Sequence, residues 1–250
     1  MTIGSIRAYT TAQTSTTHAP NALARREQVS TPKEQGTQSG SQHTLSTLAR
    51  QLADSASKAD VRDNTLSRTA LADFARTTLA QIQGEAYLAN KAQHDNEIPA
   101  TDNPDVLARA KQATAFVNDA DQGKQTVSNP FSGLSRDQLA LIVYDDSGTY
   151  TVNERRAAAS EADKQEEAWR VQLTAHAMNE YNQTGKLTQS FAAGLEHYRE
   201  LPAIEQAQYP ADYERDLESK IKSNVSYRAS QTEANEGALP NLNLFDILFP

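Results

Sequence analysis

The 250-residue sequence contains no cysteine, and glycine and proline are scarce, with ten and nine residues. Without cysteine the chain can form neither disulfide bonds nor a thiolate metal site, and it has no cysteine nucleophile. So few glycines and prolines are not typical of β-sandwiches and β-barrels, which use both in their turns. The longest uninterrupted apolar run covers residues 139–143, far short of the roughly 20 residues of a membrane-spanning helix. We therefore expect a protein without a membrane span whose folding does not depend on disulfides.

Large aliphatic side chains are also scarce, and alanine takes their place. The chain has 38 alanines against 44 residues of Leu, Ile, Val and Phe together. Alanine combined with Gln, Glu, Lys and Arg favours helices, so we predict an all-α fold, an irregular bundle of helical hairpins. The net charge of −8 makes nucleic acid a poor default partner, and we expect a protein partner instead.

Residues 1–44 differ from the rest of the chain in composition. Ser, Thr and Gln dominate this segment and large apolar side chains are sparse, so no buried face could offset the conformational entropy lost on ordering. We predict a disordered tail. Residues 1–62 carry seven basic and four acidic residues, a net +3, which leaves 17 basic and 28 acidic residues, a net −11, for residues 63–250.

The predicted tail lacks the apolar core of a cleaved secretory signal. Its acid-poor composition, rich in Ser, Thr and Gln, resembles the secretion segment of type III secreted effectors. The resemblance implies export without a cleaved signal peptide. An ordinary flexible tail on a cytoplasmic protein is the alternative.

Apolar residues recur at helical spacing in residues 45–118, which we interpret as a helical hairpin region. The spacing predicts a short helix from Leu45 and a longer helix over residues 67–91. Asn103 and Pro104 then form a strong helix start, a capping side chain followed by proline at the first helical position.

Beyond a polar connector, residues 128–228 form a better patterned helical core. Ser135 and Gln138 match a capping box. A very short strand is expected at residues 150–152, followed by a long helix that Asn153 caps. The pattern leaves open whether this core is shared with the preceding helical region.

One motif in this core has the pattern of a metal site. Within the helix–loop–helix segment 135–165, Gly148 at the sixth loop position puts the surrounding polar residues in EF-hand register. The candidate metal-site residues are Asp145, Asp146, Ser147, Tyr150 and Glu154. The loop resembles half of an EF-hand, which implies calcium as a cofactor, although Val143 at the first position has no side-chain oxygen. A hinge between two helices, without metal, is the alternative.

No motif of a known enzyme class stands out. The sequence lacks HExxH, GxSxG and a glycine-rich phosphate loop. His176 and Glu180 are one helical turn apart, but two ligands alone do not make a metal site. We therefore favour a non-enzymatic protein.

The C-terminal region 229–250 is a polar linker followed by the densest apolar cluster of the chain. This cluster supplies the predicted partner-binding residues Leu244, Phe245, Ile247, Leu248 and Phe249. Such a segment either folds back onto the helices or docks in a groove of another protein.

The sequence favours a non-enzymatic helical interaction protein, exported by a route that does not need a signal peptide. A calcium-responsive module built on the loop at residues 145–154 is the first alternative. An enzyme without a recognisable motif is the second.

Overall fold

The computed structural model describes residues 39–224, with side chains from residue 47 onward. Residues 1–38 of the predicted tail, and the C-terminal cluster with Leu244, Phe245, Ile247, Leu248 and Phe249, lie outside the described residues. Within the described part of the chain every regular element is a helix, and there are ten of them. The prediction of an all-α fold is confirmed.

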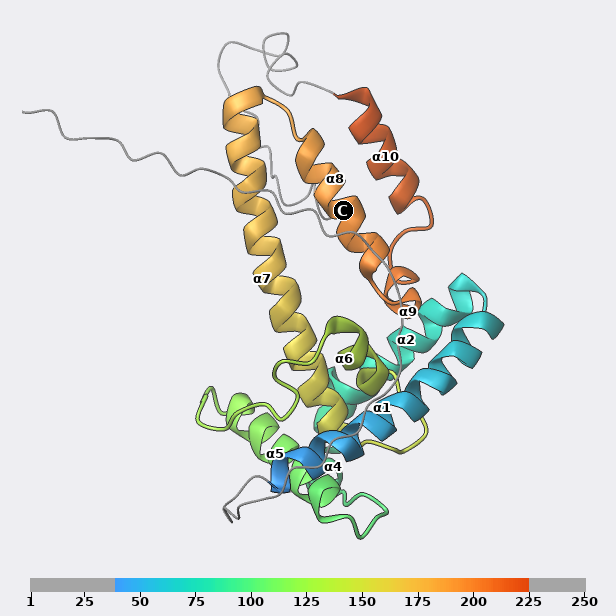
Figure 1. The fold of residues 1–250 in the computed structure, drawn as a ribbon, viewed down its shortest axis with the longest axis vertical. Helices are drawn as coiled ribbons and strands as arrows, with labels where there is room; N and C mark the ends of the chain where they lie inside the picture. Colours follow the sequence, from blue (N-terminus) through green and yellow to red (C-terminus); the bar gives the residue numbers. More distant parts are fainter. Residues whose placement is uncertain (1–38, 225–250) are drawn as a thin grey trace, which may run out of the picture. The chain divides into compact units, whose positions relative to one another are not determined.

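The helices differ widely in length. The first five are α1 (Ser39–Thr65), α2 (Arg68–Ile82), α3 (Gly84–Ala89), α4 (Lys91–Asp95) and α5 (Pro104–Asp121). The other five are α6 (Arg136–Val143), α7 (Val152–Thr184), α8 (Thr188–Glu200), α9 (Ala203–Gln206) and α10 (Tyr213–Ser223). The longest helix, α7, begins beside α5 and α6 and extends to α8 (Figure 1). Among residues 39–224, no helix has both the length and the apolar character needed to cross a membrane.

Two helix starts have the caps that the sequence predicts. At α5, Asn103 Oδ1 accepts hydrogen bonds from the backbone N–H groups of Asp105 and Val106. At α6, Ser135 and Gln138 form a complete capping box. These caps satisfy N–H groups that have no partner inside the helix. By contrast, α1 already begins at Ser39, so the helix includes the last residues of the predicted tail.

The start of α7 differs from the prediction. Thr151 is the N-cap and forms a capping box with Glu154. Residues 150–152 therefore form no strand, and Asn153 lies inside the first turn of the helix. The Asn153 side chain is used in the core instead, where its Oδ1 accepts a hydrogen bond from the Tyr87 hydroxyl at 2.7 Å.

The single helix predicted over residues 67–91 is interrupted. α2 ends at Ile82, Gln83 is extended, and Gly84 has a φ of +68°. Arg156 of α7 stabilises the break, because its guanidinium donates a hydrogen bond to the Ile82 carbonyl at 3.1 Å. Beyond the break the chain continues as the short helices α3 and α4, and α4 contacts α7.

Two hydrophobic clusters stabilise the described residues. The larger one draws on α1, α2, α5, α6 and the first half of α7, where it includes Ala157, Ala158, Ala159 and Ala162. Because these helices come from both predicted helical regions, the two regions share this core. The second cluster joins the second half of α7 to α8 and α10.

A buried ion pair joins α5 to the start of α7. Arg109 Nε donates to Glu154 Oε1 at 2.7 Å, and the two side chains are only 5% and 0% exposed. The other Glu154 oxygen accepts the backbone N–H of Thr151 at 2.9 Å. One carboxylate thus pairs with the arginine and caps the helix.

We predict that Arg109→Ala lowers the free energy of unfolding by about 3–5 kcal/mol, because Glu154 would remain buried without its cation. Urea denaturation followed by circular dichroism measures the loss. The control is Arg76→Ala, which removes an ion pair with Asp73 whose side chains are 75% and 59% exposed. This control should cost at most about 1 kcal/mol. Equal losses in the two variants would contradict the role assigned to the buried pair.

A second prediction concerns the break between α2 and α3. Gly84→Ala should lower the free energy of unfolding by about 1–2 kcal/mol, because a Cβ is strained at positive φ. Gly194→Ala is the matched control, since an added Cβ meets no atom within 4 Å at either position and Gly194 lies in α8 without a positive φ. We expect this control to gain up to about 1 kcal/mol in thermal or urea denaturation. A loss of the same size at both positions would show that backbone strain at Gly84 is not the cause.

Candidate functional site

The predicted calcium loop is attached to α1 by hydrogen bonds. The Ser55 hydroxyl donates to Asp145 Oδ2 at 2.7 Å. The Lys58 ammonium donates to Ser147 Oγ at 2.6 Å, and Ser147 donates to Asp145 Oδ1. Burial opposes ionisation of Asp145, but the hydrogen bonds from Ser147 and Ser55 outweigh it and lower its pKa. Protein donors therefore already stabilise this carboxylate.

The side chains of the other three candidate ligands make no hydrogen bond to Asp145 or Ser147. Asp146 is exposed. Tyr150 is 3% exposed, and its ring centroid lies 5.5 Å from the Arg109 guanidinium carbon. Glu154 pairs with the same arginine. Within residues 47–224, no three His, Asp or Glu side chains are grouped as a metal site would require, and the calcium site stays a prediction.

The pair formed by His176 and Glu180 contacts the start of α8. The Glu180 carboxylate accepts hydrogen bonds from the backbone N–H groups of Gln189 and Ser190 and from the Ser190 hydroxyl. His176 Nδ1 lies 3.2 Å from Ser190 Oγ. Glu180 thereby supplies the cap that the N-cap residue Leu187 cannot provide.

A cleft of about 490 Å³ lies between α2, α6, the first half of α7 and the segment around α9, and we call it the α7 cleft. Its volume falls in the range of ligand pockets. The apolar part of its lining consists of Leu79, Val143, Ala159, Ala162, Leu201 and Pro210. The polar part consists of Gln83, Arg136, Tyr144, Asp163, Glu166, Arg170, Glu205, Gln208 and Tyr209.

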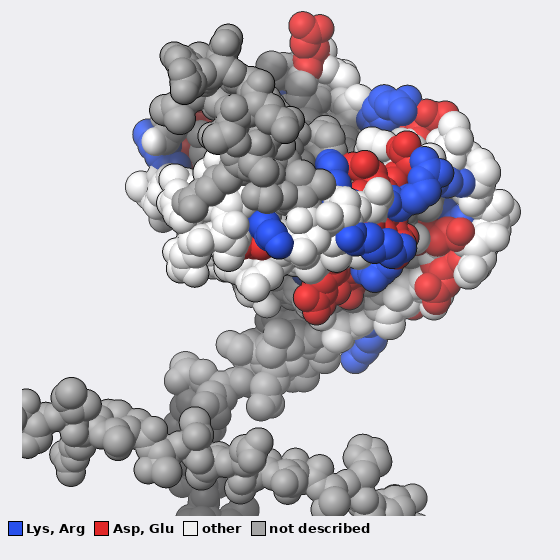
Figure 2. Space-filling view, turned by 90° about the horizontal axis from the view of Figure 1, so that it is seen from above, with Lys and Arg blue, Asp and Glu red and all other residues white. Residues whose placement is uncertain are grey.

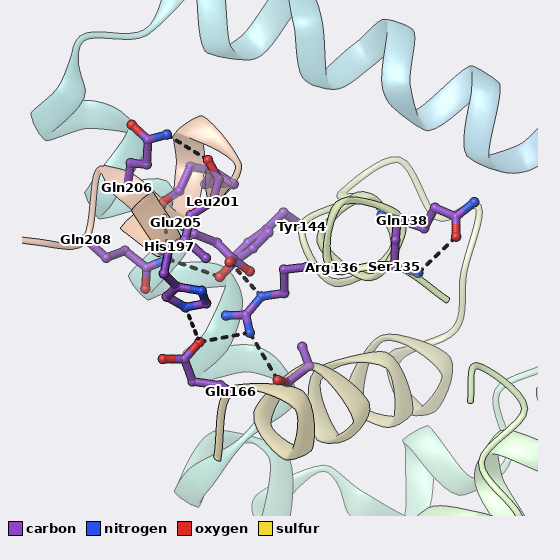
Figure 3. A network of polar contacts seen from close by, with 12 residues as sticks. Ser135, Arg136, Gln138, Tyr144, Glu166, His197, Leu201, Glu205, Gln206 and Gln208 are labelled. Atoms are coloured by element: carbon purple, nitrogen blue, oxygen red, sulfur yellow. Dashed lines mark hydrogen bonds and ion pairs between the residues drawn. The ribbon is translucent and has the colours of Figure 1, made fainter. Parts of the chain in front are cut away.

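Arg136 is the centre of a charge network in the α7 cleft (Figure 3). Its Nε donates to Glu205 Oε2 at 2.7 Å, and its Nη1 lies 3.3 Å from Glu166 Oε2. The same Nη1 donates to the carbonyl oxygen of Ala162 at 3.1 Å. One guanidinium group of α6 thus connects α7 to α9.

Glu166 has two further partners. Arg170 Nε donates to its Oε1 at 3.0 Å, and His197 Nε2 lies 3.0 Å from its Oε2. The His197 ring stacks on Trp169, with ring centroids 3.6 Å apart and planes inclined by 13°. Burial opposes ionisation of Glu166, but its hydrogen bonds and charged neighbours outweigh this effect and lower its pKa to about 2.

The other two carboxyl groups of the α7 cleft are shifted in the opposite direction. Burial raises the pKa of Glu205, and the nearby Arg136 only partly offsets this effect. Asp163 is an exposed residue, but desolvation of its carboxyl group by the surrounding cleft also raises its pKa. Burial raises the pKa of Tyr144 to about 12, so this hydroxyl stays protonated at neutral pH. To a ligand the cleft therefore presents an apolar wall, neutral hydrogen-bonding groups and carboxylates that differ in their affinity for a proton.

Two further hollows adjoin the α7 cleft. The second hollow, of about 380 Å³, shares Gln83 and Asp163 with the cleft. The third, of about 520 Å³, shares Phe116, Ala120 and Ser160 with the second. The three hollows thus follow one another around the first half of α7. On the face shown in Figure 2, acidic and basic side chains are interspersed rather than gathered in a patch of one sign.

The residues of the α7 cleft are not among the predicted site residues. The contact between Glu166 and Arg170 is a helical i, i+4 pair, which spacing alone indicates. Arg136 and Glu205 lie on other helices, and no local pattern links them to Glu166. No protein-family model, curated protein or solved structure matches the chain.

We predict that Glu166 makes the stability of the protein sensitive to acid. Its pKa is about 2 in the folded protein against an ordinary 4.5. The ionised carboxylate therefore stabilises the folded state above about pH 4.5, and this contribution is lost as the pH falls towards about 2. Glu166→Gln should lower the free energy of unfolding by a few kcal/mol near pH 6 and by much less near pH 3, measured by urea denaturation.

The control for this experiment is Glu167→Gln, which changes an exposed carboxylate on the same helix. Its stability should follow the wild-type pH dependence. If Glu166→Gln also ran parallel to the wild type between about pH 6 and pH 3, the lowered pKa would be refuted.

Proposed function

We propose that this chain is a non-enzymatic interaction protein that binds a peptide segment of another protein across the first half of α7. The observation that carries the proposal is the run of three adjoining hollows, of about 490, 380 and 520 Å³. A peptide that crosses α7 would place side chains in successive hollows. Grooves that recognise extended or helical segments use side-chain pockets in this way.

The ion pairs around the hollows support a preorganised binding surface. In the α7 cleft Arg136 is paired with Glu166 and Glu205, and in the second hollow Arg156 pairs with Asp121 at 2.9 Å. Side chains that are already held by partners lose little further conformational entropy when a ligand covers them. The apolar part of the lining would then supply the favourable free energy of burial.

The proposal predicts that Ser160→Trp blocks binding. Ser160 is exposed and lines the second and third hollows, so an indole ring there would fill them without disturbing the core. Peptides are first selected from a display library of random dodecapeptides on the immobilised full-length protein. Their affinities are then measured by fluorescence anisotropy, and we expect Ser160→Trp to weaken binding by about ten-fold or more.

The matched control is Gln172→Trp, an exposed position on α7 outside the three hollows. This variant should bind the selected peptides as the wild type does. The proposal fails if no peptide is enriched, or if the enriched peptides bind the wild type and both tryptophan variants equally.

A further inference from the structure

Within residues 47–224, Asp163 is the charged residue of the α7 cleft that forms neither a hydrogen bond nor an ion pair, and Arg136 and Arg170 attract it only at longer range. Arg136 pairs with Glu166 at 3.3 Å and with Glu205 at 2.7 Å. Arg170 pairs with Glu166 at 3.0 Å. Within residues 47–224, the Asp163 carboxylate makes neither a hydrogen bond nor an ion pair, although it lines the same cleft. Its charge is therefore available to a ligand.

The position of Asp163 places this charge where two hollows meet. The residue is exposed and lines both the α7 cleft and the second hollow. The cleft is lined by three carboxylates and two guanidinium groups, an excess of one negative charge. Among the residues that line the second hollow, Asp121 is paired with Arg156, so the carboxylate left over is again Asp163. Lys91, which also pairs with Asp121, does not line this hollow. In both hollows, the negative charge that no lining cation balances is therefore the carboxylate of Asp163.

Building on the proposed function, we infer that the bound peptide carries a lysine or arginine whose head group pairs with Asp163, next to an apolar side chain that enters the α7 cleft. A long basic side chain suits this place, because its methylene groups can cover apolar surface while its cation reaches a carboxylate. Leu79, which is only partly buried, provides apolar surface in the lining of the cleft. The amide group of Gln83, which lines the same two hollows as Asp163, offers a further acceptor.

The C-terminal segment of this chain is the competing occupant. Residues 240–250 are apolar, but they contain no lysine or arginine and one acidic residue, Asp246. Docking of this segment would leave Asp163 unpaired and would add a fourth carboxylate to a site that already has excess negative charge. Charge complementarity therefore favours a basic segment of another protein.

The test compares the peptides that three full-length proteins select from the random dodecapeptide library. We expect the wild type and the control Asp54→Lys, an exposed position on α1, to enrich peptides with lysine or arginine at a recurrent position beside apolar residues. Asp163→Lys should enrich peptides with Asp or Glu at that position. For one wild-type peptide, replacing its basic residue by glutamine should weaken binding to the wild type about 5- to 10-fold. The same replacement should have little effect on binding to Asp163→Asn.

The outcomes separate this inference from the proposed function. The inference would be overturned if Ser160→Trp blocks the selected peptides but these peptides lack a basic residue, or if their affinity does not change with the charge at position 163. The proposed function would still stand. Displacement of the selected peptide by a synthetic peptide of residues 240–250 would also overturn it. Peptides that Ser160→Trp does not block would overturn both. Thermal denaturation of Asp163→Lys and Asp163→Asn verifies that each variant is folded.

Discussion

In the core of this protein the Glu154 carboxylate makes two contacts, and the position of α7 depends on both. Glu154 accepts a hydrogen bond from Arg109 of α5 with one oxygen and caps the first turn of α7 with the other. Because the pair is almost completely buried, the first turn of α7 cannot move without separating two charges in a medium of low dielectric constant. All three hollows are lined in part by residues of the first half of α7. Their geometry therefore depends on where this helix begins and how its first turn is held.

The shortage of large aliphatic residues explains why polar groups have so large a part in the core. Ala157, Ala158 and Ala159 are almost fully buried and allow close approach to α7. Large polar side chains fill part of the remaining volume, as with Arg155, which is 8% exposed. Burial lowers the pKa of this arginine, whose Nε donates to the Val143 carbonyl at 3.0 Å. Such a partner offsets part of the cost of burying a polar group, although Nη2 of the same arginine is buried without a hydrogen-bond partner among the described residues.

Sequence patterns predicted the features that depend on neighbouring residues. Features that depend on contacts between distant helices could not be predicted. The cap at Asn103 depends on a few neighbouring residues, and it was predicted. Thr151 and Asn153 both have capping side chains, and the choice between them depends on Glu154, whose position is set by Arg109 on a distant helix. The interruption at Gly84 was missed because helical spacing continues through it, while the contact that stabilises it comes from α7. The α7 cleft could not be predicted from the sequence either, because its charged residues lie on three separate helices that only the fold brings together.

Under the proposed function, the charge network of the α7 cleft would serve selectivity in addition to its contribution to stability. Buried ion pairs often contribute no more to stability than apolar residues of the same volume would, so Arg136, Glu166 and Glu205 are not needed merely to close the gap between helices. Their pairing has another effect, because it cancels the positive charges of the cleft and leaves a single negative charge at Asp163. A ligand without a cation would cover this carboxylate and remove its hydration without replacing it. The apolar wall would then govern how strongly a segment binds, and the unpaired carboxylate would govern which segment is accepted.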